Sequence, residues 1–240
     1  MIFACDDKEK SVPKITIATA ANMHFTMSEL VKIFTQKTGI QCDLVINSSG
    51  KLTAQIQQGA PYDVFVAADM KYPNEIFNQG RSYAPPKVYA YGKLVLWSMI
   101  DNVQPSVALL TAKNIKHIAI ANPKTAPYGI AAIDALKHHQ KLKSIEHKLV
   151  YGESIGQVNQ FINSKSVTVG FTALSVVLSS NIKGKGHWTA IDTTAYNPIQ
   201  QGVILIKQKK ENTTHAEKFY NFLFSNEAKS ILEKFGYLVK

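Results

Sequence analysis

Four short segments of this chain place small and hydroxyl-bearing residues where a predicted strand ends and a predicted helix begins. They are Ala20-Ala21-Asn22, Asn47-Ser48-Ser49-Gly50, Thr125-Ala126-Pro127-Tyr128-Gly129 and Gly152-Glu153-Ser154-Ile155. The first backbone N–H groups of a helix have no partner inside the helix, and the helix dipole adds positive potential there. Each segment is therefore suited to hold an anion, and together they predict one site at which they converge. Neutral donors, rather than arginine and lysine side chains, would hold the anion there.

Each segment also has a plainer interpretation. Asn22 and Ser49 are residue types that commonly cap helices through their own side chains. Tyr128 follows a proline and could be a surface aromatic residue. Ile155 would act only through its backbone N–H, which any residue would supply. The site hypothesis therefore depends on the four segments meeting in space.

Signatures of catalysis are few in this sequence. It contains no nucleophile elbow, zincin motif, P-loop or dinucleotide-binding glycine motif. His24 lies beside the first segment and could line the site, but an exposed helix position is its commoner role. Asp63 and Asp69 flank a predicted strand, where a cap and a turn residue are commoner than a metal site. We therefore expect a binding protein that is not an enzyme and has no cofactor.

Hydrophobic periodicity predicts a βα pattern that occurs twice. Predicted strands are 14–20, 40–46, 63–67, 94–99, 117–120, 148–151, 168–171 and 202–206, and predicted helices are 23–38, 51–58, 72–78, 129–138, 155–162, 173–179, 216–224 and 226–235. Alternating strands and helices favour mostly parallel sheets covered by helices. The prediction is an α/β clamshell of two lobes, residues 14–90 plus 203–240 and residues 91–202. Ligands of such sheets bind beyond the carboxyl ends of the strands, where the four segments lie.

Composition narrows the range of partners. The 240 residues carry a net charge of +10 but only one arginine, Arg81. Arginine is the usual reader of phosphates and guanines, so the scattered lysines argue against nucleic-acid binding. A positive field would instead attract small anions from a distance. No apolar run reaches the roughly 18 residues of a membrane-spanning helix.

The first residues suggest how the chain is exported. A small residue precedes Cys5, and a charged stretch follows it, as at the end of a bacterial lipoprotein signal. Phe3 is unusual for that motif. The alternatives are a free Cys5 in a frayed terminus and a disulfide with Cys42. Residues 1–13 are expected to form a flexible tail, lipidated at Cys5 if the signal is genuine.

Several motifs together resemble the periplasmic molybdate-binding proteins of ATP-driven (ABC) importers, which are type II periplasmic binding proteins. The resemblance runs from about Lys14 to Lys240. It is carried by Ala20-Ala21-Asn22, the run from Asn47 to Ile56, the run from Gly59 to Asp69, Pro127-Tyr128-Gly129 and Phe235-Gly236-Tyr237. The run from Gly59 to Asp69 is the most specific. The resemblance implies a periplasmic, monomeric protein that delivers its anion to a membrane permease.

The resemblance also implies a set of ligands. Asn22 and Ser49 would bind the oxyanion from the first lobe, with Ala21 adding its main chain, and Tyr128 and Ile155 would bind it from the second. These residues would bind the metal only as an oxyanion, not as a bare cation. Many members have a tyrosine where this chain has Ala173. This chain resembles the branch with a tyrosine at position 128, whose hydroxyl would replace the missing donor.

The chemistry of the anion leaves alternatives open. Molybdate and tungstate are full dianions at neutral pH, so a site for them should offer donors and no carboxylate acceptor. Sulfate has the same charge and is smaller, and phosphate can use an acceptor because it still titrates near neutral pH. Glu153 is expected to face solvent or its own helix, and phosphate would gain if it faced the anion. The remaining alternatives are a metal complex as ligand, or an enzyme or sensor built on the same clamshell.

Overall fold

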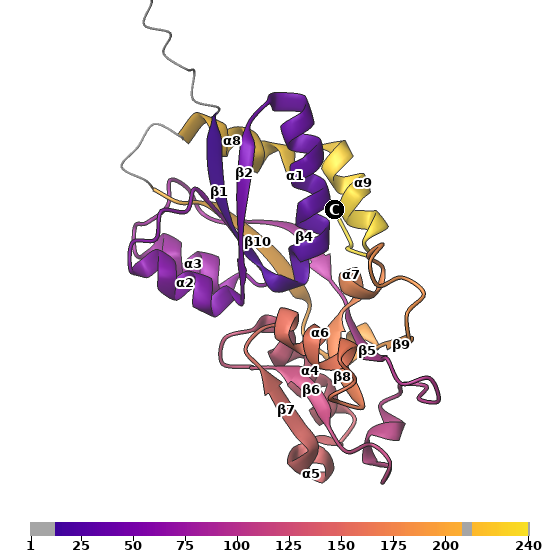
Figure 1. Ribbon diagram of the computed structural model, residues 1–240. Coiled ribbons are helices and arrows are strands. Elements are labelled where there is room, and N and C mark those ends of the chain that lie inside the picture. The colour runs from indigo at the N-terminus through magenta and orange to yellow at the C-terminus, as the bar shows by residue number, and fades with distance from the viewer. Residues whose placement is uncertain (1–12, 208–212, 240) are drawn as a thin grey trace, which may run out of the picture.

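The structure is a computed structural model that describes residues 13–207 and 213–239. It has two lobes, each built on a five-stranded sheet with helices packed against it (Figure 1). The α/β two-lobed class predicted from the sequence is confirmed. Within the described residues, no helix combines the length and the apolar character needed to cross a membrane.

The first sheet has the strand order β2-β1-β3-β10-β4. Its strands are β1 (Lys14–Ala20), β2 (Gln41–Asn47), β3 (Val64–Ala67), β4 (Lys87–Gly92) and β10 (Ile199–Leu205). β1 pairs in parallel with β2 and β3, whereas β10 pairs antiparallel with both β3 and β4. The sheet therefore contains both parallel and antiparallel pairs. β10 and β4 are also the strands that connect the two lobes.

Alternate residues of the central strands fill two separate cores on the two faces of this sheet. One core contains Ile15, Ile17 and Val66, and it is covered by α1 (His24–Thr38), α8 (Thr213–Phe222) and α9 (Asn226–Lys234). The other contains Ala18 and Phe65, and it is covered by α2 (Ser49–Gln57) and α3 (Lys71–Asn78). This alternation is the period-two pattern of strands buried on both faces.

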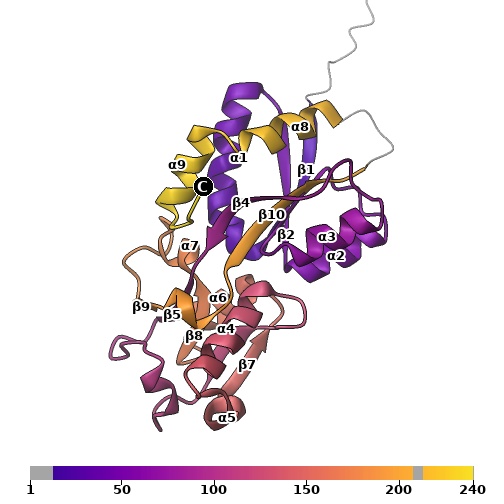
Figure 2. The same cartoon turned by 180° about the vertical axis from the view of Figure 1, so that it is seen from behind.

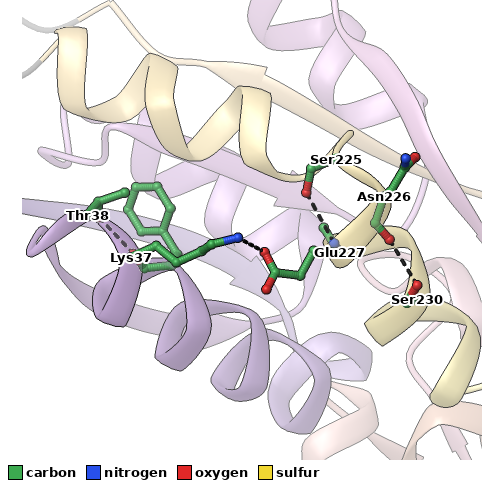
Figure 3. Close-up of polar contacts among 8 residues, drawn as sticks. Lys37, Thr38, Ser225, Asn226, Glu227 and Ser230 are labelled. Atoms are coloured by element: carbon green, nitrogen blue, oxygen red, sulfur yellow. Dashed lines mark hydrogen bonds and ion pairs between the residues drawn. The ribbon is translucent and has the colours of Figure 1, made fainter.

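The C-terminal segment is fixed to the first lobe by polar and backbone contacts. Lys37 of α1 pairs with Glu227 of α9, and the Ser225 hydroxyl caps α9 by accepting the Ala228 N–H at 3.2 Å (Figure 3). After α9 the chain bridges to β4, where Tyr91 and Leu238 exchange backbone hydrogen bonds of 2.8 and 3.0 Å. These contacts bring residues 235–239 to the junction between the lobes.

The second sheet has the strand order β7-β6-β8-β5-β9. Its strands are β5 (Leu94–Ser98), β6 (Ile118–Ala121), β7 (Leu149–Gly152), β8 (Val169–Ala173) and β9 (His187–Ala190). β6 is parallel to β7 and β8, and β5 is antiparallel to β8 and β9. Its helices are α4 (Pro127–His138), α5 (Leu142–Ile145), α6 (Ile155–Asn163) and α7 (Leu174–Val177).

The lobes are joined by two crossings of the chain. β4 of the first sheet ends at Gly92, and β5 of the second sheet begins at Leu94. The return path leaves β9 and enters β10 at Ile199 after the 3-10 helix η4 (Thr193–Ala195). Figure 2 shows both connections running side by side at the back of the molecule. Three further 3-10 helices are η1 (Ala21–Met23), η2 (Ala108–Thr111) and η3 (Glu146–Lys148).

Candidate functional site

A small pocket between the lobes brings all five predicted ligand residues together. Its lining consists of Ala20, Ala21, Asn22, Ser48, Ser49, Ala68, Ala126, Pro127, Tyr128 and Ile155. η1 and α2 contribute from the first lobe, and α4 and α6 contribute from the second, at the boundary between the lobes (Figure 1). The four sequence segments therefore do converge, as their positions at strand ends predict.

Helix starts supply the backbone donors on the side of the second lobe. Pro127 opens α4 and has no N–H, and the Gly129 N–H is bonded to the Ala126 carbonyl at 2.9 Å. Tyr128 therefore carries the free N–H of this turn. Ile155 is the first residue of α6, where the Ser154 hydroxyl caps the Gln157 N–H at 3.4 Å. That cap leaves the N–H of Ile155 without a partner inside the helix.

Ser49 provides a hydroxyl donor from the first lobe. Its side chain is 1% exposed, and its oxygen accepts the Ala68 N–H at 3.0 Å. Because that bond uses an oxygen lone pair, the hydroxyl hydrogen remains to be donated. A hydroxyl oriented in this way suits an anion that only accepts hydrogen bonds.

Asn22 lies at the pocket, but its side chain is used elsewhere. Its amide nitrogen donates to the Gln201 side-chain oxygen at 2.8 Å and to the Tyr237 hydroxyl at 3.0 Å. An amide nitrogen has two hydrogens, so both are engaged. The donor that Asn22 can offer to an anion is therefore its backbone N–H in the first turn of η1.

The hydroxyl of Tyr128 lies at the junction of the lobes. It is buried and has no hydrogen-bond partner within the described residues. It lies so close to Gly92 that a Cβ added there would be 2.1 Å from the phenolic oxygen. Burial, and then the neighbouring Tyr237, raise the pKa of Tyr128 well above its ordinary value, so the phenol is neutral. The two polar groups of Tyr128 therefore lie apart: its backbone N–H is at the start of α4, and its hydroxyl is beside Gly92 at the end of β4, where the chain crosses between the lobes.

None of the described residues that line this pocket carries a carboxylate. Glu153 pairs with Lys51 across the lobe boundary, and its side chain is 67% exposed. Asp63 accepts the Thr16 N–H at 2.7 Å, and Asp69 accepts the Tyr72 N–H at 3.2 Å, so both act as local acceptors. Burial raises the pKa of Asp69 to about 6. A fully ionised oxyanion would therefore meet donors rather than a repelling carboxylate.

Direct contacts between the lobes surround the pocket. The Gly50 N–H donates to the Thr125 carbonyl at 2.9 Å, and the Tyr72 hydroxyl donates to the Lys124 carbonyl at 3.1 Å. An added Cβ on Gly50 would lie 3.0 Å from the Thr125 backbone. The lobes are therefore in a closed arrangement, with Gly50 at one of the places where their backbones meet.

Other residues singled out in the sequence lie outside the pocket. His24 is exposed and stacks on Phe25 with ring centroids 4.9 Å apart. Among the described residues no group of three or more His, Cys, Asp and Glu side chains is arranged to hold a metal ion. Cys42 is a free thiol whose pKa is raised to about 12, chiefly by burial. Cys5, its predicted disulfide partner or lipid attachment point, lies outside the described residues.

Sequence reasoning missed several polar residues near the pocket. Ser48 lines it, and its buried hydroxyl has no partner among the described residues. Gln201 and Ser175 surround Asn22 from distant parts of the chain. Of these three residues, only Ser48 could have been found from the sequence, because it belongs to one of the four segments.

A larger cavity of about 490 Å³ lies beside the end of β4 and the start of β10, where the chain crosses between the lobes. Its lining includes Tyr91, Gly92, Tyr196 and Ile199 and is mainly apolar. Among the described elements only the short 3-10 helix η4 begins in its lining, at Thr193, so it lacks the several convergent helix starts of the small pocket. The small pocket is therefore the better candidate for an anion site.

The chain is similar to known proteins in both sequence and structure. The family model described as bacterial extracellular solute-binding protein matches residues 15–238. The molybdate-binding protein ModA of Rhodobacter capsulatus is 36% identical over 230 residues, covering 95% of this chain and 89% of that protein. A putative ABC transporter substrate-binding lipoprotein, YvgL of Bacillus subtilis, is 26% identical over 235 residues, covering 96% of this chain and 88% of that protein.

The solved structure of the periplasmic molybdate-binding protein of Azotobacter vinelandii is similar throughout. It superposes with a TM-score of 0.89 at 33% identity, covering 94% of this chain and 99% of that one. Similarity therefore extends over both lobes and the junction between them.

Proposed function

The chain belongs to the family of bacterial extracellular solute-binding proteins that includes the molybdate-binding proteins, and from this we propose that it captures molybdate for an ABC importer. Its relatives are binding proteins, and this chain is a binding protein rather than an enzyme. The anion would sit in the small pocket between the lobes, and closure of the lobes would present the loaded protein to a membrane permease.

The observation that carries this proposal is the donor set of the pocket. The five residues Ala21, Asn22, Ser49, Tyr128 and Ile155 line one pocket, and its described lining contains no carboxylate. We assign the backbone N–H groups of Asn22, Tyr128 and Ile155, with the Ser49 hydroxyl, as the principal donors. Ala21 would add its main chain. Hydrogen bonds to a charged acceptor are about twice as strong as neutral ones, so a few of these donors can hold a dianion.

Tungstate is expected to bind in the same way. It has the charge and the tetrahedral shape of molybdate, and backbone donors read charge and shape rather than the identity of the central metal. Sulfate has the same charge but is smaller, so fewer of the donors would reach it at once. Discrimination against sulfate would then depend on how completely the lobes close.

The proposed importer places the protein outside the cytoplasm. Its family is described as extracellular solute-binding, and the Bacillus subtilis relative is named as a lipoprotein. Attachment through a lipid on Cys5 is the corresponding proposal for this chain, and mass spectrometry of the protein purified from its native membrane would test it. A monomer is expected, because one chain supplies every donor of the pocket.

Thermal unfolding with a panel of anions tests the proposal. A ligand that binds only the folded protein stabilises it by about 2.7 kcal/mol at a hundred times its Kd. Molybdate and tungstate should raise the Tm at concentrations where sulfate and phosphate do not. A rise with sulfate or phosphate alone would assign the pocket to another oxyanion and would overturn the proposal.

A further inference from the structure

Three residues form a closed ring of hydrogen bonds behind the pocket. The Asn22 side-chain amide donates to the Tyr237 hydroxyl at 3.0 Å. The Tyr237 hydroxyl lies 3.0 Å from the Ser175 hydroxyl, and the Ser175 hydroxyl donates to the Asn22 carbonyl at 2.8 Å. All three side chains are buried.

The chemistry of the groups fixes the direction of the two bonds that begin and end at Asn22. The Asn22 nitrogen can only donate, and the Asn22 carbonyl can only accept. Tyr237 therefore accepts from Asn22, and Ser175 donates to the Asn22 carbonyl. The single hydroxyl hydrogen of Tyr237 has two acceptors in reach, the Ser175 hydroxyl at 3.0 Å and the Asn22 carbonyl at 3.2 Å, and the shorter contact closes the ring. Burial raises the pKa of Tyr237 to about 12, so its hydroxyl keeps the proton that this arrangement needs.

The second hydrogen of the Asn22 side-chain amide is donated to Gln201. Its side-chain oxygen accepts that hydrogen at 2.8 Å, and its own nitrogen donates to the Ile199 carbonyl at 3.1 Å. Gln201 lies beside a shift in register between β10 and β4, and such bulges change the direction in which a side chain points. Gly202 follows it, where a Cβ would lie 2.7 Å from the Asp69 carbonyl.

The ring joins elements of both lobes. Asn22 belongs to η1 and Tyr237 follows α9, both in the first lobe. Ser175 belongs to α7, which directly follows β8 of the second sheet, and α7 packs against η1 and α1 (Figure 1). The bonds to Ser175 therefore depend on how the second lobe lies against the first.

We propose that Tyr237, Ser175 and Gln201 are positioning residues for the anion site. They hold Asn22 so that its backbone N–H faces the pocket, and the ring is complete only when α7 of the second lobe lies against η1. This inference rests on the proposed function, because it names the residues that join the bound oxyanion to lobe closure. Anion binding would be tightened by the ring, and ring formation would be favoured by the anion, because coupling between two such events is reciprocal.

The test removes single hydroxyls from the full chain. Tyr237→Phe breaks the ring from the first lobe, and Ser175→Ala breaks it from the second. Tyr89→Phe is the matched control, because Tyr89 is also a buried tyrosine near Tyr237, but its hydroxyl has no hydrogen-bond partner among the described residues. Molybdate affinity and dissociation rate are measured for each variant, together with amide hydrogen exchange of the peptide covering residues 20–27.

The ring predicts a specific pattern of results. Tyr237→Phe and Ser175→Ala should each weaken molybdate binding by about tenfold, mainly through faster dissociation, because each leaves buried polar groups without partners. The double variant should be little weaker than either single variant, since both break the same ring. Exchange at residues 20–27 should rise in the molybdate-saturated variants, and Tyr89→Phe should match the parent in all three measurements.

Two outcomes would overturn the inference, and they differ from failure of the proposed function. In one, the ring variants lose thermal stability but keep the molybdate dissociation rate of the parent, which would make the ring purely structural. In the other, the two substitutions add fully in the double variant, which would mean that they do not share a ring. If the parent itself binds sulfate or phosphate in place of molybdate, the proposed function fails, and the same variants test the ring with that anion.

Discussion

Ser49→Ala is the substitution that tests the donor set most sharply. The change deletes a hydroxyl that is 1% exposed, lines the pocket and accepts the Ala68 N–H at 3.0 Å. Alanine keeps the backbone N–H groups at the start of α2 and is a good helix former. The perturbation is therefore confined to one oxygen and the bonds that it makes.

The magnitude follows from the two bonds of that hydroxyl. A hydrogen bond to a charged group is worth about 1.5–3 kcal/mol, which corresponds to roughly a 10- to 150-fold loss of molybdate affinity. Loss of the acceptor also leaves the Ala68 N–H unpaired, which costs about 1–3 kcal/mol of stability in the ligand-free protein. The variant should therefore be weaker in binding and lower in Tm at the same time.

Isothermal titration calorimetry gives the affinity, and thermal unfolding of the ligand-free protein gives the stability. Ser179→Ala is the control, because the Ser179 hydroxyl is equally buried but donates to the Val176 carbonyl at 2.6 Å, within its own lobe. That variant should lose stability and keep its affinity. If Ser49→Ala binds molybdate as tightly as the parent, the Ser49 hydroxyl does not contact the anion and the assigned donor set is wrong.

Three further predictions concern closure, the hinge and pH. Gly50→Ala should weaken molybdate binding, measured by calorimetry, because its Cβ would lie 3.0 Å from the Thr125 backbone of the other lobe. Tm should change little, because the nearest atom within its own lobe, the Tyr72 hydroxyl at 2.8 Å, is the end of a side chain that can shift; unchanged affinity would show that closure does not need the Thr125 contact. Gly92→Ala should lower Tm, because its Cβ would lie 2.1 Å from the Tyr128 hydroxyl, and adding Tyr128→Phe should restore part of the loss; no restoration would refute that clash. Burial raises the pKa of Asp69 from 3.8 to about 6, so stability from this group is present below about pH 4 and is lost as pH rises toward 6. Asp69→Asn should remove that part of the pH dependence in unfolding experiments, and an unchanged pH profile would contradict it.

Much of the architecture could be predicted from local signals. Gly39 ends the predicted first helix, and in the structure it caps α1 in the left-handed conformation with a φ of 71°. Pro127 opens α4, a position where a missing N–H costs nothing. These signals depend only on residues that are close together in the sequence, so both helix ends could be predicted without the structure.

Pairing of strands across the lobes could not be predicted in the same way. The sequence suggests mostly parallel sheets, but β10 and β5 are antiparallel to their neighbours. These strands carry the chain between lobes, so their direction is set by the connections rather than by their own residues. β9 was not predicted, because its four residues are mainly exposed and lack the apolar alternation of a strand.

The candidate site was likewise predictable only in part. Convergence of the helix starts follows from the order of strands and helices, because the carboxyl ends of parallel strands share one edge. The side-chain role of Asn22 does not follow, since its partners Gln201 and Tyr237 are 179 and 215 positions away. The hydroxyl of Tyr128 is a similar case, because its place beside Gly92 depends on how the lobes meet.

Calorimetric titration of the ligand-free parent protein with molybdate, with sulfate and phosphate titrated in parallel, tests whether the pocket between the lobes is a molybdate site. We predict tight binding of one molybdate per chain and little heat from the other two anions, since the described lining of the pocket offers convergent donors and no carboxylate. Absence of molybdate binding, or tighter binding of sulfate or phosphate, would contradict this prediction.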